Sequence, residues 1–220
     1  MHDSVSSLIT IQEELKLKII DNVKRFKIPK IIAVSKTFKI NNILPLINHG
    51  HVHFGENKVQ EATEKWVDIR SDFKHLKLHM IGKLQTNKVK HAISLFDYIH
   101  SLDNLKLAKK ISEEQIKQNK KLKIFIQVNI GDEESKSGIN IESIEDFYKE
   151  CLNLNLDIVG TMCIPPKIKN SKNYFSEIYK INTKINLPDL SMGMSGDYLE
   201  AAENDSTFLR IGSKIFGERN

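Results

Sequence analysis

A lysine at the end of an apolar run is the first residue of this sequence that could do chemistry. The run Ile31-Ile32-Ala33-Val34 follows Pro29, and Ser35-Lys36-Thr37 closes it. Successive β-branched and apolar residues are typical of a strand buried on both faces, whose last side chain reaches the rim of a parallel sheet, where ligands bind. Partial burial at that rim favours the neutral amine form of Lys36, which attacks carbonyl carbons in Schiff-base chemistry. The alternative is a strand-end lysine that simply reaches water.

Two glycine- and serine-containing segments near the other end of the sequence could hold an anion. They are Ser191-Met192-Gly193-Met194-Ser195-Gly196 and Arg210-Ile211-Gly212-Ser213. Glycines let backbone N–H groups approach an anion closely, the serines add hydroxyl donors, and a helix beginning after Gly212 would aim its positive end at the same place. Gly/Ser turns are also common without a ligand, and Arg210 could instead form a structural ion pair.

The elements that would position these residues alternate regularly along the chain. Buried-strand patterns and amphipathic helix patterns follow one another, and a further helix pattern from about Ser4 to Lys24 precedes the first strand. Strict alternation of this kind implies right-handed crossovers and a parallel sheet. The predicted strands cover 31–37, 51–54, 76–81, 98–100, 122–130, 156–164, a segment ending at 189–195, and 207–212.

Eight strand–helix units favour a closed barrel. Barrels of this type begin at about 200 residues, and the 220 residues present leave no length for a second domain. We therefore expect residues 1–220 to form a single α/β domain, a (β/α)₈ TIM-type barrel with an extra N-terminal helix. An open doubly wound sheet is the alternative if the weak strand 98–100 does not form. Closure would make the first and last strands neighbours, so that Lys36 and the anion-holding segments share one mouth. Pyridoxal 5′-phosphate carries both an aldehyde and a phosphate, and suits such a mouth.

Composition argues for a globular protein of the reducing cytoplasm. Hydrophobic residues make up 40% and charged residues 28% of the chain, and no apolar run reaches the length of a membrane span. The N-terminus lacks the basic start and apolar core of a secretion signal. Cys151 and Cys163 are too few for a disulfide framework and are expected to be buried thiols. The net charge of +5 comes from lysines scattered along helices, which argues against nucleic acid and leaves an anionic ligand open.

Short motifs stand at nearly every predicted strand end. In chain order they are Ala33–Thr37, Phe54–Glu61, His79–Lys88, Val128–Ile130 with Ser135–Gly138, Gly160–Pro166, Ser191–Asp197 and Arg210–Gly217. Together they resemble the pyridoxal phosphate homeostasis protein family, the YggS/PROSC-like proteins, which is related to the N-terminal barrel of alanine racemase. The sequence departs from the family pattern at Met80, Thr161 and Asn204-Asp205, and Met80 could alter how the cofactor ring packs.

The resemblance implies a site for pyridoxal 5′-phosphate and assigns residues to it. These are Lys36 as the lysine of an internal aldimine, Ser195, Gly212 and Ser213 at the phosphate, Arg210 beside the phosphate or the ring nitrogen, and Asn57 in the lining. Separately, Lys83 and Lys136 lie in polar segments at the expected barrel rim, and we predict that they assist ligand transfer.

The resemblance also implies a function without dedicated catalysis. An arginine rather than an acid near the ring nitrogen leaves that nitrogen unprotonated and weakens the ring as an electron sink. We therefore expect a cytoplasmic protein, monomeric and without membrane or nucleic-acid partners, that buffers the cofactor or delivers it to pyridoxal phosphate-dependent apoenzymes. The alternative is a racemase, an aminotransferase or a related enzyme with the same cofactor.

Two other chemistries have weaker support. His49, His51 and His53 alternate, and His-x-His at a barrel strand end is a metal-hydrolase pattern. The matching carboxylate and distant histidine ligands are not evident, so no metal is expected. Glu56 and Glu61 lie five residues apart on an expected helix and would diverge, which disfavours a paired-carboxylate hydrolase.

Overall fold

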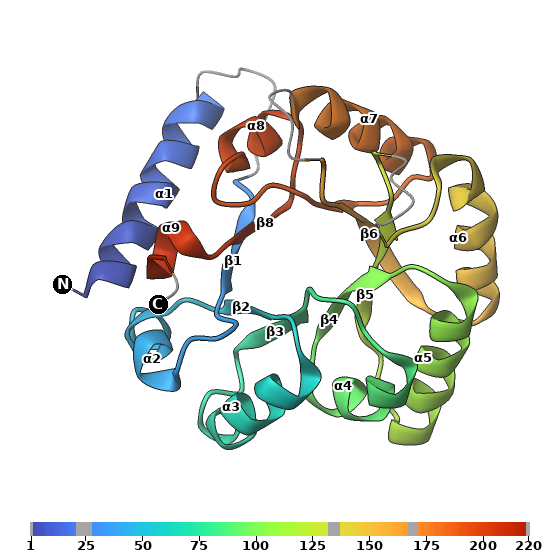
Figure 1. The fold of residues 1–220 in the computed structure, drawn as a ribbon, viewed down its shortest axis with the longest axis horizontal. Helices are drawn as coiled ribbons and strands as arrows, with labels where there is room; N and C mark the ends of the chain where they lie inside the picture. The colour runs from blue at the N-terminus through green and yellow to red at the C-terminus, as the bar shows by residue number, and fades with distance from the viewer. Residues whose placement is uncertain (1, 21–27, 132–136, 167–170, 219–220) are drawn as a thin grey trace.

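A computed structural model describes residues 2–20, 28–131, 137–166 and 171–218. Its parallel strands close into a barrel in which each strand pairs with the next and the last returns to the first (Figure 1). The strands are β1 (Lys30–Val34), β2 (His53–Glu56), β3 (Lys77–Met80), β4 (Tyr98–Leu102), β5 (Lys123–Val128), β6 (Asp157–Cys163), β7 (Asp189–Ser191) and β8 (Phe208–Ile211). The predicted (β/α)₈ barrel is confirmed, and the open-sheet alternative is wrong.

Helices surround the barrel and connect its strands (Figure 1). They are α1 (Asp3–Ile20), α2 (Ile40–Asn48), α3 (Val59–Asp72), α4 (Val89–Leu95), α5 (Leu105–Gln118), α6 (Ile144–Asn153), α7 (Ser171–Lys184), α8 (Tyr198–Glu203) and α9 (Ser213–Phe216). Single 3₁₀ turns, η1 (Thr86–Lys88) and η2 (Ile141–Ser143), introduce α4 and α6. The predicted extra N-terminal helix is α1, and its expected last residues, 21–24, lie outside the described residues. No helix of the described segments is long and apolar enough to cross a lipid bilayer.

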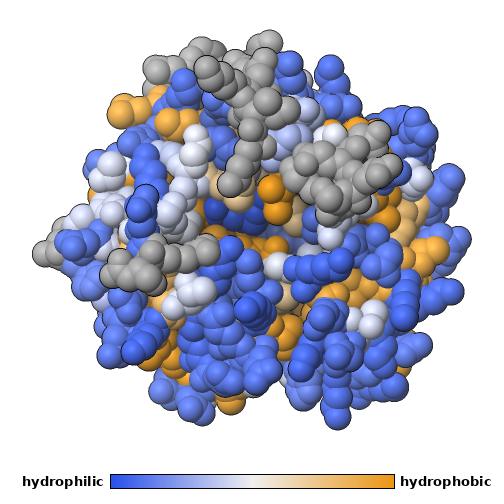
Figure 2. Space-filling model, in the orientation of Figure 1, coloured by the Kyte–Doolittle hydropathy of each residue, from blue (hydrophilic) through white to orange (hydrophobic). Residues whose placement is uncertain are grey.

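Two hydrophobic layers stabilise the barrel. The larger layer lies between the strands and the helices, and Phe54, Trp66 and Phe175 are among its fully buried members. The smaller layer fills the barrel interior and consists of Ile32, Tyr98, Phe125, Val159, Met162 and Phe208. Figure 2 shows hydrophilic side chains over the surrounding helices, with apolar side chains visible between them. Burial on both faces explains why the strand sequences read as continuous apolar runs.

Several strand ends differ from the sequence prediction by one or two residues. The second strand begins at His53 rather than at residue 51, because the backbone N–H of His51 bonds the carbonyl of Leu46 at the end of α2. The fourth strand, predicted as the weakest, is entirely buried and extends to Leu102. Cys151 and Cys163 are free and buried, as expected.

Helix α1 braces the end of the barrel where the last helices lie. Tyr198 of α8 donates a hydrogen bond to Glu14 of α1, and the Lys214 ammonium of α9 bonds Glu14 at 2.8 Å and the Tyr198 hydroxyl oxygen at 2.6 Å. Lys18 pairs with Glu203 at 2.7 Å on the same side. Figure 1 shows α1 alongside α9. The additional helix therefore supports the segments that follow β7 and β8.

Candidate functional site

Pairing between β1 and β8 brings the predicted lysine next to the predicted anion cradle. Ala33 faces Ile211 in this pairing, so the chain after Val34 and the chain after Ile211 leave the barrel side by side. A Cβ added at Gly212 would lie 3.4 Å from Val34 Cβ. Lys36 is half-buried two residues beyond β1. The geometry therefore places both predicted groups at the same, C-terminal mouth of the barrel.

A buried ion pair fixes the turn that carries Lys36. The Lys65 ammonium of α3 donates to the Ser35 carbonyl at 2.8 Å and to the Glu56 carboxylate at 3.0 Å. The Ser35 hydroxyl donates to the same Glu56 oxygen at 2.8 Å, and the Trp66 indole N–H does so at 2.9 Å. Glu56 is completely buried and Lys65 is 8% exposed. Because a buried charge without a partner is costly, this network holds Ser35 firmly.

Thr37 follows Lys36 in a conformation that few residues adopt. Its φ of 69° is in the left-handed region, which is unusual for a β-branched side chain. The Thr37 backbone N–H donates to Glu61, whose carboxylate also pairs with Lys65 at 3.1 Å. Glu56 ends β2 and Glu61 lies in α3, so the two carboxylates converge on Lys65. The prediction that they diverge on one helix is wrong, because the chain changes from strand to helix between them.

Ser195 and the start of α9 form a cluster of hydrogen-bond donors. The backbone N–H groups of Gly212 and Lys214 each lie 3.3 Å from the Ser195 hydroxyl oxygen and donate to it. Ser213 is exposed beside them. Gly193, two residues before Ser195, has a φ of +88°, which favours glycine. It also packs closely against α8, because an added Cβ would stand 2.5 Å from Ala201 Cβ. Two converging N–H groups in this position suit an oxygen-rich anion.

Arg210 lies deeper in the barrel than this cluster. Its guanidinium donates to the Ser191 hydroxyl at 2.7 Å and to the Cys163 carbonyl at 2.8 Å, so it bridges the ends of β7 and β6. Arg210 is 5% exposed. Burial lowers the pKa of Arg210 from its ordinary value and raises the pKa of the Cys163 thiol to about 12. The sequence left open a structural ion pair for Arg210. The two acceptors of its guanidinium are neutral, so these two bonds are not an ion pair.

Two more of the predicted residues, Asn57 and Lys83, lie around the same mouth. Asn57 is half-buried immediately after β2, and the loop at Gly82 approaches it so closely that an added Cβ would stand 2.4 Å from the Asn57 carbonyl oxygen. Lys83 is exposed in that loop. Lys136 lies outside the described residues. The structure therefore gathers Lys36, Asn57 and Lys83 beside the loops after β1, β2 and β3.

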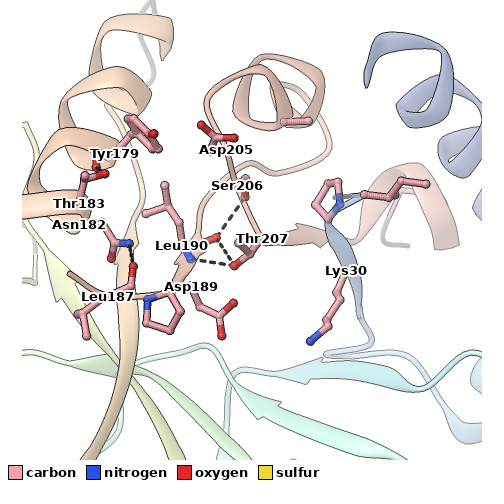
Figure 3. Close-up of a pocket in the computed structure, with 14 residues that line it drawn as sticks. Lys30, Tyr179, Asn182, Thr183, Leu187, Asp189, Leu190, Asp205, Ser206 and Thr207 are labelled. Carbon is pink, nitrogen blue, oxygen red and sulfur yellow. Dashed lines mark hydrogen bonds between the residues drawn. The ribbon is translucent and has the colours of Figure 1, made fainter. Parts of the chain in front are cut away.

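A cavity of about 230 Å³ lies at the opposite end of the barrel (Figure 3). Lys30, Asp189 and Thr207 line it at the starts of β1, β7 and β8. The polar groups of Ser206 and Thr207 are engaged with the Leu190 backbone. This end of the barrel contains none of the predicted site residues.

The three departures from the family pattern have local explanations. Met80 belongs to the layer between strands and helices rather than to the barrel interior. The Thr161 hydroxyl donates to the Asn182 side-chain oxygen at 2.9 Å. Asp205 has a φ of 62°, a conformation that glycine adopts most readily and aspartate tolerates.

The alternating histidines do not form a metal site in the described part of the chain. There, no group of three histidine, cysteine, aspartate or glutamate side chains is arranged to hold a metal ion. His51 bonds the carbonyl of His53 at 2.9 Å, and the His53 ring bonds His79. Sequence reasoning missed that His79 and His100 are linked through Ser191 to Arg210, because the side chains come from four different strands.

Comparison with known proteins identifies the family. Residues 17–220 match the family model described as alanine racemase, N-terminal domain. A pyridoxal phosphate homeostasis protein from Aquifex aeolicus is 37% identical over 200 residues, which cover 86% of this chain and 87% of that protein. The chain belongs to the pyridoxal phosphate homeostasis protein family. A member from Haemophilus influenzae is 36% identical over 225 residues, with 97% of this chain and 95% of that protein covered.

A solved structure related to this family supports the same assignment. PipY of Synechococcus elongatus with pyridoxal phosphate bound has a TM-score of 0.81 and 28% identity, over 92% of this chain and 100% of that chain. The resemblance to the pyridoxal phosphate homeostasis protein family, first seen in the strand-end motifs, is therefore confirmed across nearly the whole chain. The roles of individual residues remain predictions.

Proposed function

We propose that this protein binds pyridoxal 5′-phosphate at the C-terminal mouth of its barrel and acts in the homeostasis of that cofactor. The observation that carries the proposal is the pairing of Ala33 with Ile211, which joins an amine to an anion-binding cluster. The names of the relatives and the PipY structure with pyridoxal phosphate bound support it. When bound, the cofactor supplies an aldehyde that condenses with an amine and releases water.

The residues of the mouth fit the parts of this cofactor. The N–H groups of Gly212 and Lys214, which converge on the Ser195 oxygen, are suited to a phosphate oxygen, and Ser195 and Ser213 supply hydroxyl donors. Lys36 supplies the amine from a turn that Lys65 holds in place. Because Arg210 lies deeper and bonds β6 and β7, we assign it to the ring nitrogen rather than to the phosphate. Asn57 lines the side of the mouth.

The chemistry of Arg210 favours buffering or delivery over catalysis. A guanidinium only donates hydrogen bonds, so it offers a ring nitrogen no proton acceptor and disfavours the protonated ring that stabilises carbanions. The match to the alanine racemase N-terminal domain makes an amino-acid racemase the competing function. We assign the protein to the cytoplasm as a monomer that passes the cofactor to apoenzymes, with Lys83 and Lys136 assisting transfer.

Borohydride trapping tests the proposal directly. Purified protein incubated with pyridoxal 5′-phosphate should gain visible absorbance, and reduction followed by peptide mapping should locate the cofactor on Lys36. Lys36→Ala should lose the trapped cofactor, whereas Lys39→Ala, an exposed lysine nearby, should retain it. Unchanged uptake and trapping in Lys36→Ala would refute the site.

Two further measurements separate delivery from catalysis and test the phosphate cluster. Ser195→Ala should weaken binding by roughly 10-fold or more, since hydrogen bonds to charged groups contribute about 1.5–3 kcal/mol. Incubation with amino acids should give no multiple turnover in α-deuterium exchange or product formation. Sustained turnover would replace homeostasis with the racemase-type alternative.

A further inference from the structure

A line of histidines crosses the barrel interior and ends at Arg210. The His53 Nδ1 lies 2.9 Å from His79 Nε2, and His79 Nδ1 lies 2.9 Å from His100 Nε2. His100 Nδ1 lies 2.9 Å from the Ser191 hydroxyl oxygen, which accepts the 2.7 Å bond from Arg210. The five side chains come from β2, β3, β4, β7 and β8 and form one continuous hydrogen-bonded chain.

The line connects the two ends of the barrel. His79, His100 and Ser191 are completely buried, and Arg210 is 5% exposed. At the far end, His53 lines a pocket of about 390 Å³ beside the first residues of β1. Stacking fixes the planes of the middle rings, because the His79 ring lies 4.2 Å from the Tyr98 ring and the His100 ring lies 4.3 Å from the Phe125 ring.

Arg210 determines the direction of every bond in this line. A guanidinium can only donate, so the Ser191 oxygen must accept from Arg210 and is free to donate its own proton. Among the described residues, the only other partner of this hydroxyl is His100 Nδ1. If His100 donated instead, the buried Ser191 proton would have no acceptor, which native proteins avoid.

The same argument passes from ring to ring. Once Nδ1 of His100 accepts, its Nε2 must carry the proton of a neutral ring and donate to His79 Nδ1. The Nε2 proton of His79 then donates to His53 Nδ1. Burial lowers the pKa of His79 and His100 well below the ordinary value and lowers that of His53 to about 4, so all three rings are neutral near pH 7.

We infer that His53, His79 and His100 are positioning residues that hold Ser191 and Arg210 in one orientation toward the cofactor. The role toward the cofactor rests on the proposed function, whereas the direction of the bonds depends only on this chain. With its proton committed to His100, the Ser191 hydroxyl presents a lone pair to Arg210 and keeps the guanidinium from rotating. Each of these histidines acts through its hydrogen-bonded neighbour in the line.

Nitrogen NMR of ¹⁵N-histidine-labelled protein tests the bond direction without any cofactor. At pH 7, His79 and His100 should each show one protonated nitrogen, Nε2, and one bare nitrogen, Nδ1. Ser191→Ala removes the hydroxyl that fixes the direction of these hydrogen bonds, so the Nδ1-protonated tautomer should appear in both His79 and His100. Nδ1 protonation in the wild-type protein, or a single unchanged tautomer in Ser191→Ala, would overturn the inference. His91 is exposed on α4, and the signals that disappear in His91→Gln identify its ring, which serves as the solvent-exposed control.

Cofactor release tests the positioning role. After loading with pyridoxal 5′-phosphate, His100→Leu should shift the visible spectrum and release the cofactor ~10-fold faster, the effect of one lost hydrogen bond. His100→Asn, which keeps an acceptor for Ser191, should approach the wild-type rate. A wild-type spectrum and release rate in His100→Leu would refute the positioning role. A wild-type protein that takes up no cofactor, yet shows the expected tautomers, would instead refute the proposed function and leave the bond direction standing.

Discussion

Acidification should destabilise this protein through its partly and fully buried histidines. The pKa of His51 and that of His53 are each lowered to about 4, chiefly because burial disfavours the charged ring. Neighbouring charges add to the effect at His53, where His51, Lys30 and Lys77 repel a proton and Asp97 attracts one. An unfolded histidine has a pKa of about 6.5. Between these values the unfolded chain binds protons that the folded protein does not.

The sign and size of the effect follow from this difference in proton binding. Since the unfolded state takes up more protons below pH 6.5, the free energy of unfolding falls as the pH falls toward 4. From pH 7 to pH 5, each of these two rings contributes a loss of about 2 kcal/mol, or about 4 kcal/mol together. His79 and His100, whose pKa values are also lowered by burial, act in the same direction. Because domains are stable by only about 5–15 kcal/mol, the loss is large.

Urea denaturation at pH 7 and pH 5, followed by circular dichroism, measures the difference. His53→Gln keeps an acceptor for His79 but removes one titrating ring, so its loss of stability between the two pH values should be about 2 kcal/mol smaller than that of the wild type. His91→Gln is the matched control for loss of an exposed imidazole. Equal unfolding free energies at both pH values, or a His53→Gln variant with the full wild-type pH dependence, would refute the reasoning.

Two further predictions concern the supports of the mouth. Gly193→Ala should lower the unfolding free energy by about 2 kcal/mol or more, because its Cβ would stand 2.5 Å from Ala201 Cβ; a change below about 0.5 kcal/mol in urea denaturation would contradict this. Lys65→Met should cost about 3–5 kcal/mol, since it leaves Glu56 charged and buried without its cation. Lys149→Met, which removes a solvent-exposed ion pair, serves as the control, and a similar loss in both variants would contradict the assignment.

The barrel could be predicted from the sequence because its signals are local and repeated. Each strand is a short apolar run and each helix an amphipathic one, so their alternation specifies the topology. The placement of the segments after Val34 and Ile211 at one mouth followed from closure of the barrel, and the pairing of β1 with β8 confirms that closure. Even the short run at Tyr98 forms a full strand, because it is buried on both faces.

The polar contacts inside the barrel could not be predicted in the same way. His53, His79 and His100 become neighbours only through the register between β2, β3 and β4, and residue spacing along the chain does not specify that register. The alternation of His51 with His53 resembled a metal motif, although their strand begins only at His53. Likewise, Glu56 reaches Lys65 because the chain turns from strand to helix between them, whereas Glu61 pairs with Lys65 as its i,i+4 neighbour on α3.

The proposed site spans the pairing between β1 and β8, so its ligand binding depends on closure of the barrel. In the proposed site, Lys36 after the first strand supplies the amine and Gly212 after the last strand belongs to the phosphate-binding cluster, so a chain divided between β4 and β5 would carry these two groups on separate fragments. Neither fragment could retain the ligand alone, whereas reassembled fragments would bind it again once β1 pairs with β8. In the proposed site, release of the ligand and separation of β1 from β8 are therefore thermodynamically linked, so ligand binding stabilises the closed barrel.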